Sequence, residues 1–496
     1  QVVYPDDLDL LLVELELLST GRKVFHNLHY RWMGKNHETI WINCRGRVLS
    51  DPEDGSPRYL VGCINEIGAK QKADNVSGLL GEYSLKIFYE SRSPKLPQGF
   101  LLRIGIDDFK NINESHGNEY GDYILRRTAQ CIEENIGPEQ SLFHIVADEF
   151  AVVDFSGGSV ETAEKLFHEI KKSIYAFIEQ NQYKAVYTVS GGIVENGDVD
   201  NSFENAMKLS EFALSQAKER GKNSCYVFEQ KEYEDYLKSR TLLRQLHHAV
   251  NNGFEGFEAY FQPLVNAANG ELTGAETLLR FHSPEGGMVS PGEFIPILEE
   301  SGLIIPVGRW VLRQALDACR EWQKILPEFK VNVNLSYVQV LKSRVLTDVR
   351  RIVDEFGVKP SSVCIELTES GYLEENERFD KVWNGLKEYG VLLALDDFGT
   401  GYSNLRCLSD LKPAYIKIDR SFTLKALNRE YEYRLLNHIV EMSHSLGLHV
   451  CVEGIETEGE LTKAKQTEPD YIQGFLFGKP CSRAEFTQKF FTKQAG

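Results

Sequence analysis

The sequence predicts an α/β protein whose C-terminal part is a (β/α)8 barrel, preceded by two smaller α+β units. Three observations lead to this prediction. The chain has 496 residues, enough for about three domains. Hydrophobic residues make up 42% of the chain and charged residues 26%, which is the balance of a globular protein that buries a core. From about residue 255 onward, apolar strand patterns alternate with helical patterns in the rhythm of a barrel.

Charge and cysteine usage narrow the class of protein. Asp and Glu total 73 against 55 Lys and Arg, so the formal charge is −18. An acidic chain is a poor binder of nucleic acid polymers, and a phosphorylated ligand would need bound cations and a few basic side chains. Nine cysteines without a CxxC pair are typical of reduced thiols in a cytoplasmic protein. Because the chain opens at Gln1 in mid-pattern, we expect a piece of a longer protein, in which an upstream membrane anchor is conceivable.

Residues 1–72 are predicted to form a small α+β segment. Alternating apolar and polar residues indicate three antiparallel strands at 29–33, 39–48 and 58–65, and the apolar stretch 8–18 is a candidate covering helix. The Trp in the central strand and the exit sequence Gly62-Cys-Ile-Asn-Glu-Ile resemble the C-terminal half of a PAS domain. We therefore expect a truncated, PAS-like sensory segment. The alternative is an unrelated α+β cap.

Residues 73–229 are predicted to form a second α+β unit. Strand patterns occur at 101–106, 141–145, 150–153 and 185–190, and helical patterns occur at 122–136 and 205–220. Glycine pairs, including Gly191-Gly192, are interpreted as turns. The charged stretch 230–245 is expected to be a helical linker, either solvated or dimerising, and we predict a homodimer.

In residues 246–496, strand patterns end in polar residues. Because the carboxyl ends of parallel barrel strands meet at one rim, we expect these side chains to gather there. They are Glu276, Asn334, Glu366, Asp396, Asp397 and Glu453, with Lys417 among them. A ring of oxygen ligands without Cys or His suits Mg²⁺ or Mn²⁺. Strand ends that merely face water would explain one or two acids, but not this set.

The ordered motifs of residues 246–496 resemble those of an EAL domain, which has a TIM-like barrel. Ala275-Glu-Thr-Leu-Leu-Arg280 is similar to the Glu-Ala-Leu signature, and three further motifs follow the family order: Tyr260-Phe-Gln-Pro-Leu-Val, Asp396-Asp-Phe-Gly-Thr-Gly-Tyr-Ser and Gln473-Gly-Phe-Leu-Phe-Gly-Lys-Pro. Thr277 replaces the middle Ala of the signature. Successive strand side chains face opposite ways, so Thr277 should point away from Glu276 and cost little activity.

The resemblance implies an enzyme that hydrolyses cyclic di-GMP to linear pGpG with two metal ions, Mg²⁺ or Mn²⁺. It implies three catalytic residues: Lys417, which orients or polarises the attacking water, Glu453, the base or a further ligand, and Glu276. The implied metal ligands are Glu276, Asn334, Glu366, Asp396, Asp397 and Glu453. The implied substrate-binding residues are Gln262, Arg280, Asn334, Asp397, Glu456 and Gln473. Of these, Glu456 would pin the loop from Asp397 to Ser403.

Residues 73–229 resemble a GGDEF diguanylate cyclase domain but lack several residues that the family uses for catalysis. The matching motifs are Asp74-Asn-Val-Ser-Gly-Leu, Ile106-Asp-Asp-Phe-Lys-Asn-Ile-Asn-Glu and Ala217-Lys-Glu-Arg-Gly-Lys-Asn. The signature loop reads Val146-Ala-Asp-Glu-Phe, without its two glycines, and Gly105 stands where the family has a metal-binding Asp. If the loop needs positive φ, Val146 fits worst.

The residues that the resemblance assigns to guanine recognition, Asn113 and Asp122, are retained in this domain. We therefore expect a catalytically inactive, regulatory domain that is still able to bind GTP.

Three functions remain open at this point. The first is an active cyclic di-GMP phosphodiesterase, and the second is a receptor that binds cyclic di-GMP without cutting it. These two differ in whether the metal-loaded protein releases pGpG. The third is a bifunctional enzyme that also makes cyclic di-GMP, which Gly105, Val146 and Ala147 oppose.

Overall fold

The computed structural model divides into two compact units, residues Gln1–Asp235 and Tyr236–Gly496, which are described separately. It describes residues 2–492 apart from 34–38, 52–55, 68–73, 75, 93–98, 182–185, 199–201, 369–376 and 400–404. Within these ranges, no helix is long and apolar enough to cross a membrane.

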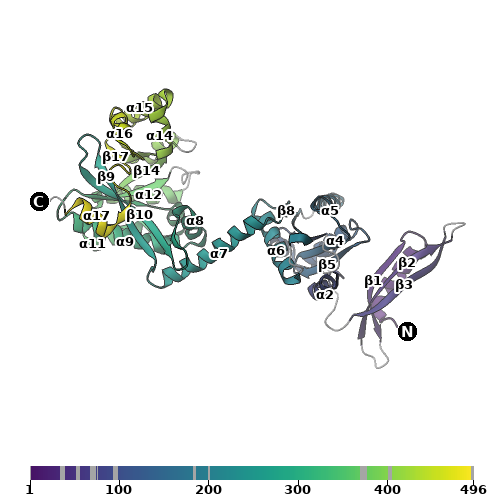
Figure 1. Ribbon diagram of the computed structural model, residues 1–496. Helices are drawn as coiled ribbons and strands as arrows, with labels where there is room; N and C mark the ends of the chain where they lie inside the picture. Colours follow the sequence, from purple (N-terminus) through teal and green to yellow (C-terminus); the bar gives the residue numbers. More distant parts are fainter. Residues whose placement is uncertain are drawn as a thin grey trace. The chain divides into compact units, whose positions relative to one another are not determined.

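The N-terminal part of the first unit is a three-stranded antiparallel sheet (Figure 1). Its strands lie in the order β1 (Phe25–Met33), β2 (Thr39–Ser50) and β3 (Pro57–Ile67), preceded by η1 (Pro5–Asp7) and α1 (Leu8–Ser19). The predicted strands and helix are thus present, and each strand is longer than its alternating pattern. Asp7 holds the start of α1 to β1, because its carboxylate accepts hydrogen bonds from Arg31 Nε at 2.9 Å and Nη2 at 2.6 Å.

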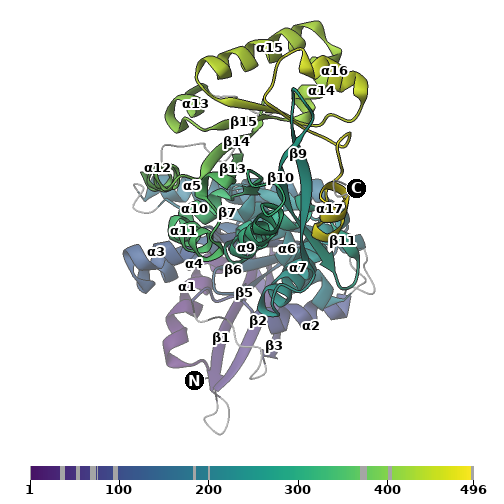
Figure 2. The same ribbon diagram turned by 90° about the vertical axis from the view of Figure 1, so that its left-hand side faces the viewer.

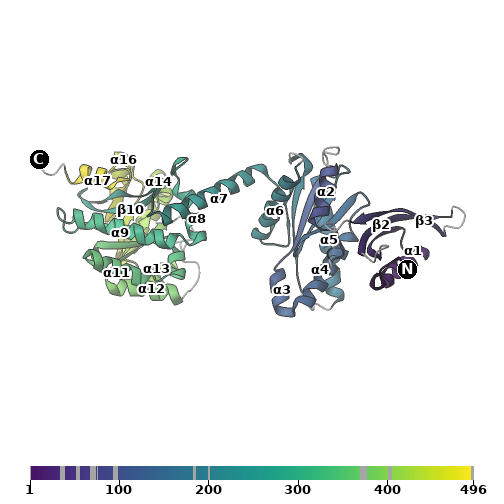
Figure 3. The same cartoon turned by 90° about the horizontal axis from the view of Figure 1, so that it is seen from below.

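The remainder of the first unit is built on a five-stranded sheet in the order β5-β6-β4-β7-β8. Helices α4 and α5 bury their apolar residues on one face of this sheet, and α6 lies on the other (Figure 3). The strands are β4 (Phe100–Ile106), β5 (Gln140–Val146), β6 (Glu149–Asp154), β7 (Val189–Glu195) and β8 (Cys225–Val227). The helices are α2 (Glu82–Arg92), α3 (Phe109–His116), α4 (Asn118–Glu133), α5 (Val160–Gln180), η2 (Asn196–Asp198) and α6 (Phe203–Glu219).

The interpretation of Gly191-Gly192 as a turn is wrong, because both glycines lie inside β7. They allow helices to approach the two faces of the sheet closely. A Cβ on Gly191 would lie 2.8 Å from the Phe167 ring of α5, and one on Gly192 would lie 2.3 Å from the Leu214 backbone nitrogen of α6. Real Cβ contacts are not that short, so close packing, rather than a turn, requires glycine here.

A single helix, α7 (Gln230–Asn251), follows β8 and covers the stretch predicted as a helical linker. Its C-terminal end belongs to the core of the second unit, where Leu246 and Ala249 are buried. The boundaries proposed for the four segments of the chain remain predictions.

The second unit is a closed barrel of eight strands. β9 (Phe257–Asn266) pairs with both β10 and β17 and so closes the ring β10-β12-β13-β14-β15-β16-β17. These strands are β10 (Leu272–Ser283), β12 (Lys330–Asn334), β13 (Val363–Thr368), β14 (Leu392–Phe398), β15 (Tyr415–Ile418), β16 (His449–Val452) and β17 (Tyr471–Gln473). Short strands β11 (Gly287–Val289) and β18 (Cys481–Ser482) pair with β10 and β9.

One strand departs from an all-parallel barrel: β9 runs antiparallel to both of its neighbours. The connection from β9 to β10 covers only residues 267–271, which is too short for the crossover that a parallel pair needs. The barrel therefore begins with a hairpin, and the other seven strands run parallel to one another.

Helices surround the ring, and the main core lies between them and the strands (Figure 2). Trp322 of α9 is fully buried in this layer, and its Nε1 donates a hydrogen bond to Thr487 Oγ1 of α17 at 2.8 Å. The helices are α8 (Pro291–Ser301), α9 (Ile304–Trp322), α10 (Tyr337–Lys342), α11 (Val345–Phe356), η3 (Pro360–Ser362), α12 (Glu377–Tyr389), α13 (Leu405–Leu411), α14 (Arg420–Asn428), α15 (Glu430–Ser445), α16 (Glu458–Lys465) and α17 (Arg483–Phe490).

Candidate active site

The barrel strands place polar side chains inside the ring because alternate residues face opposite ways. On β12 and β13, for example, Val331, Val333 and Ile365 belong to the outer core, so Asn334 and Glu366 face the interior. Glu276 lies in β10, Asp396 in β14 and Lys417 in β15, and Glu453 follows β16 directly. Polar residues from separate strands thus meet at one place.

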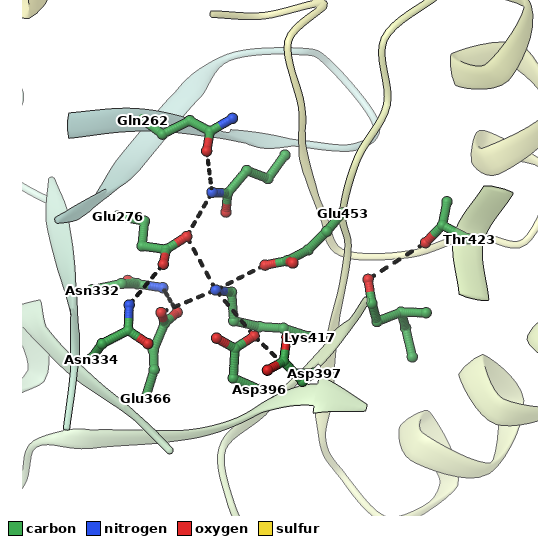
Figure 4. Close-up of polar contacts among 12 residues, drawn as sticks. Gln262, Glu276, Asn332, Asn334, Glu366, Asp396, Asp397, Lys417, Thr423 and Glu453 are labelled. Atoms are coloured by element: carbon green, nitrogen blue, oxygen red, sulfur yellow. Dashed lines mark hydrogen bonds and ion pairs between the residues drawn. The ribbon is translucent and has the colours of Figure 1, made fainter. Parts of the chain in front are cut away.

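The Lys417 ammonium is the centre of this cluster (Figure 4). Its Nζ lies 2.8 Å from Glu453 Oε1, 3.0 Å from Glu366 Oε2 and 3.2 Å from Glu276 Oε2. Asp396 Oδ1 is 3.4 Å away. The Lys417 side chain is only 2% exposed, so one buried cation stabilises four carboxylates that come from four different strands or strand ends.

Amide side chains orient the carboxylate of Glu276. Asn334 Nδ2 donates to Glu276 Oε1 at 2.8 Å, and Gln473 Nε2 donates to Glu276 Oε2 at 2.7 Å. Gln473 Nε2 also donates to Gln262 Oε1 at 3.0 Å. Among the described residues, no partner binds the buried Gln473 Oε1, which leaves an acceptor for a ligand.

Asn332 also belongs to the cluster, although the sequence analysis did not select it. Its Nδ2 donates to Glu366 Oε1 at 2.7 Å, and both side chains are buried. The signal was present in the sequence, because Asn332 lies two residues before Asn334 and residues i and i+2 of a strand share a face.

Burial and mutual repulsion shift the ionisation of the cluster. Burial, with the charges of neighbouring carboxylates, raises the pKa of Glu366 and of Asp396, and raises the pKa of Glu453 to about 8. Burial alone would lower the pKa of Lys417, but the surrounding carboxylates raise it well above its ordinary value. One ammonium is thus too little positive charge for four ionised carboxylates.

This donor set fits a divalent cation. Glu276, Glu366 and Asp396 each offer a carboxylate oxygen, and these oxygens lie within 4.8 Å of one another. Oxygen donors with excess negative charge are what Mg²⁺ and Mn²⁺ bind. Added positive charge would offset both the burial and the repulsion that raise the pKa values of Glu366 and Asp396.

Asp397 lies beside this donor set in a strained backbone conformation. Its φ of 57° is left-handed, and its backbone nitrogen donates to Asp396 Oδ1 at 3.0 Å. Burial, together with the charge of Asp396, raises the pKa of Asp397 to about 6. Strained non-glycine residues are frequent at functional sites, which agrees with a ligand role for Asp397.

The predicted substrate-binding residues Arg280 and Glu456 contact residues outside the Lys417 cluster. The Arg280 guanidinium is 5.6 Å from the centre of the Tyr260 ring, and Nη1 donates to the Leu279 carbonyl at 2.9 Å. Glu456 pairs with Arg420 Nη2 at 2.5 Å. Residues 400–404 lie outside the described part of the chain, so the predicted role of Glu456 toward that loop remains a prediction.

The signature loop of the middle domain is the turn between β5 and β6. Its left-handed residue is Ala147, with φ 51°, whereas Val146 ends β5 and is exposed. The expected strain therefore falls on Ala147, not on Val146. The carboxylate of Glu149 in this loop is already bound by Arg103, whose Nε donates a hydrogen bond to Oε2 at 2.7 Å.

Of the two retained guanine-recognition candidates, Asn113 has a buried Oδ1 without a hydrogen-bond partner among the described residues. A Cβ on Gly121 would lie 1.8 Å from that oxygen, so the glycine before Asp122 makes room for the amide.

Comparison with known proteins identifies each part of the chain. Family models match the PAS fold over residues 1–64, the diguanylate cyclase GGDEF domain over 84–224 and the EAL domain over 243–480. The barrel is thus an EAL domain. The chain belongs to the tandem GGDEF–EAL family, with a PAS-fold segment in front.

Several curated relatives align with much of the chain. An uncharacterized protein, y4lL of Sinorhizobium fredii, is 33% identical over 82% of this chain and 49% of its own length. MucR of Pseudomonas aeruginosa, named a bifunctional diguanylate cyclase/cyclic di-GMP phosphodiesterase, is 29% identical over 77% of this chain and 55% of its own. The cyclic di-GMP phosphodiesterase PdeR of Escherichia coli is 28% identical over 91% of this chain and 67% of its own.

A solved structure agrees with this assignment. The cGMP-bound form of EAL enzyme Bd1971 is 28% identical, with a TM-score of 0.50, over 61% of this chain and 80% of that chain. The chain spans about half the length of y4lL and of MucR.

Proposed function

We propose that the barrel hydrolyses cyclic di-GMP to linear pGpG with Mg²⁺ or Mn²⁺ in a two-metal site. The observation that carries this proposal is the buried set of four carboxylates around Lys417, supported by amide donors. The phosphodiesterase names of PdeR and MucR support the same substrate and reaction.

In the proposed reaction, a water oxygen forms a bond to phosphorus and one P–O bond to a sugar breaks, so that the sugar oxygen leaves with a proton. When bound, two divalent cations supply a water of lowered pKa and neutralise the charge that develops on the phosphate. Lys417 donates hydrogen bonds that hold the attacking water. Glu453, the most exposed of the four carboxylates at 18%, accepts the proton of that water.

The substrate is held by side chains at the edge of this centre. Arg280 binds a phosphate, and Gln262 and Gln473 bind polar edges of the ligand. Asn334 and Asp397 contact both metal and substrate, and Glu456 holds the loop that begins at Asp397.

We further propose that the GGDEF domain makes no cyclic di-GMP and regulates the barrel by binding GTP. Gly105 brings no carboxylate, and the turn at Ala147 carries a side chain where the family signature has glycine. Asn113 keeps a buried acceptor that no described residue satisfies, which supports guanine recognition. GTP can regulate only if it binds one state of the chain more tightly than another.

A second function has an observation of its own. Lys417 gives the four carboxylates a counter-charge from the protein itself, which favours a barrel that binds cyclic di-GMP without cutting it and acts as a receptor. Incubation with cyclic di-GMP and Mn²⁺ or Mg²⁺, followed by chromatography of the products, separates the two. Release of pGpG supports the enzyme, and binding without release by either metal-loaded form supports the receptor. Glu276→Ala is the control for contaminating activity.

A further inference from the structure

A carboxylate outside the barrel cluster contacts the loop that follows Asn334. Asn334 is the last residue of β12, and Ser336 lies two positions later, directly before α10. Ser336 Oγ donates a hydrogen bond to Glu299 Oε1 of α8 at 2.6 Å. This contact connects the end of β12 to a helix that is distant in the sequence.

The position of Glu299 in α8 is electrostatically unfavourable for the helix itself. Glu299 lies in the last turn of α8, which ends at Ser301 and contains no basic residue in that turn. The C-terminal end of a helix carries partial negative charge, so a carboxylate there is repelled. Among the residues that the structure describes, no cation forms an ion pair with Glu299, and its hydrogen bond is the one from Ser336. Helix stability therefore does not explain a carboxylate at this position.

The hydrogen bond to Glu299 also fixes the hydroxyl of Ser336. A hydroxyl has one proton, and because this proton goes to Glu299, the lone pairs of Oγ remain for the helix that Ser336 caps. Val338 N donates to Ser336 Oγ at 3.2 Å, and Ser336 N donates to Gln339 Oε1 at 3.1 Å. Gln339 is buried against α9, where a Cβ on Gly308 would lie 2.2 Å from its Nε2. The start of α10 is thus held by α8, by its own cap and by α9.

The Asn334 amide depends on this loop for its position (Figure 4). Asn334 pairs with Glu366 of β13, but on the β10 side the pairing ends at Val333. Leu335 N donates to the Glu366 carbonyl at 2.8 Å, which continues the contact with β13 alone. Asn334 Nδ2 donates to Glu276 Oε1 at 2.8 Å, so the amide oxygen is the atom that can ligate a cation. A residue paired on one side only needs further support from the loop after it.

We propose that Glu299 positions Asn334 as a metal ligand by holding Ser336, so that removal of Glu299 weakens metal binding in the barrel although every ligand is still present. Groups that hold a metal ligand in place contribute about 10- to 100-fold to metal affinity. Glu299 itself touches neither metal nor substrate, so it is a positioning residue. This inference rests on the proposed metal-dependent function of the barrel.

Mn²⁺ binding to the full chain, measured by electron paramagnetic resonance without nucleotide, tests the proposal. The barrel site is the part of this binding that Glu276→Ala abolishes. Glu299→Ala should raise the dissociation constant of that site by about tenfold or more. Glu299→Gln keeps an oxygen that accepts the hydrogen bond from Ser336, and should stay within about threefold of the parent. Glu300→Ala, which removes the same charge from the exposed next position of α8, is the matched control and should bind like the parent.

Variants of Ser336 test the same contact from the other side. Ser336→Gly removes the hydroxyl but leaves a residue that is tolerated at the start of a helix, so α10 should still form. It should weaken Mn²⁺ binding about as much as Glu299→Ala does. The double variant should be no weaker than either single variant, because the same hydrogen bond is lost in all three. At saturating Mn²⁺, kcat of Glu299→Ala should return to within about threefold of the parent, a recovery that general damage to the barrel would not allow.

The outcomes separate this inference from the proposed function. Melting curves in EDTA show which variants fold, and Ser336→Gly decides if Glu299→Ala does not. Parental Mn²⁺ affinity in the folded variants, or additive losses in the double variant, would overturn the inference and leave the phosphodiesterase standing. Weakened Mn²⁺ binding in a chain that releases no pGpG would support the inference and overturn hydrolysis. A parent that binds no more Mn²⁺ than Glu276→Ala would overturn both.

Discussion

At the scale of single residues, Lys417 has two roles in the barrel. Its ammonium is the counter-charge for four buried carboxylates, and it is also the proposed donor to the attacking water. These two roles lead to different measurable consequences when the side chain is removed.

Lys417→Ala should therefore reduce turnover by about 10²-fold or more, as loss of a single electrostatic stabiliser does. Breaking a buried ion-pair cluster should also cost about 3 kcal/mol of stability in EDTA, because carboxylates remain buried without a cation. Mn²⁺ should recover much of that loss, since it binds the same carboxylates. Melting curves with EDTA and with Mn²⁺ check this, and equal curves for variant and parent in EDTA would contradict it.

Asn332 is predicted to position Glu366 rather than to touch substrate. Asn332→Ala removes the 2.7 Å hydrogen bond and leaves Glu366 Oε1 without that donor. We expect kcat to fall by about tenfold, with KM nearly unchanged, because the cost of one hydrogen bond to a charged group is about 1.5 kcal/mol. Thr277→Ala, which restores the usual signature on the opposite face of β10, is the control and should stay within about twofold of the parent. A large rise in KM for Asn332→Ala would argue against a positioning role.

At the scale of elements, the strands of the barrel could be predicted from the sequence more completely than the polar cluster inside the barrel. Polar residues at the ends of apolar strand patterns located Asn334, Glu366 and Asp396 correctly on the strands. The antiparallel β9 was not predicted, because an apolar pattern does not carry strand direction. Asn332 was not predicted, because it lies inside its strand pattern rather than at the polar end, although the interior face continues along the strand.

The middle domain shows why a glycine pair alone does not reveal its role. Gly191 and Gly192 lie where helices α5 and α6 pack closely against opposite faces of β7. This close approach is a result of tertiary packing, which the local sequence does not show. Gly192→Ala should destabilise the domain by about 3 kcal/mol or more, since the new Cβ would meet the backbone of α6 at 2.3 Å. Gly197→Ala, where nothing lies within 4 Å of a built Cβ, is the control. Denaturant unfolding measures both, and equal midpoints would show that the helix moves aside freely.

At the scale of the whole molecule, the domain order is what distinguishes this chain from an isolated barrel. A PAS-fold segment and a GGDEF domain precede the barrel along the chain. The homodimer expected from the charged helix α7 remains a prediction, as do the domain boundaries.

If the GGDEF domain regulates the barrel, GTP should change the phosphodiesterase rate of the full chain by about fivefold or more, the usual range of coupling between sites. ATP should have a much smaller effect, because Asn113 and Asp122 are proposed to recognise guanine. Initial rates at subsaturating cyclic di-GMP with either nucleotide measure this. Identical rates with GTP, ATP and no nucleotide would remove the regulatory role.

The central claim is that the carboxylates around Lys417 form a metal-dependent phosphodiesterase site. The most direct measurement is chromatography of cyclic di-GMP after incubation with the full chain in Mn²⁺, in Mg²⁺ and in EDTA, with Glu276→Ala alongside. We predict pGpG with at least one of the two metals, none in EDTA and none from the variant. Intact cyclic di-GMP in every lane, from protein that binds the dinucleotide and Mn²⁺, would contradict the account.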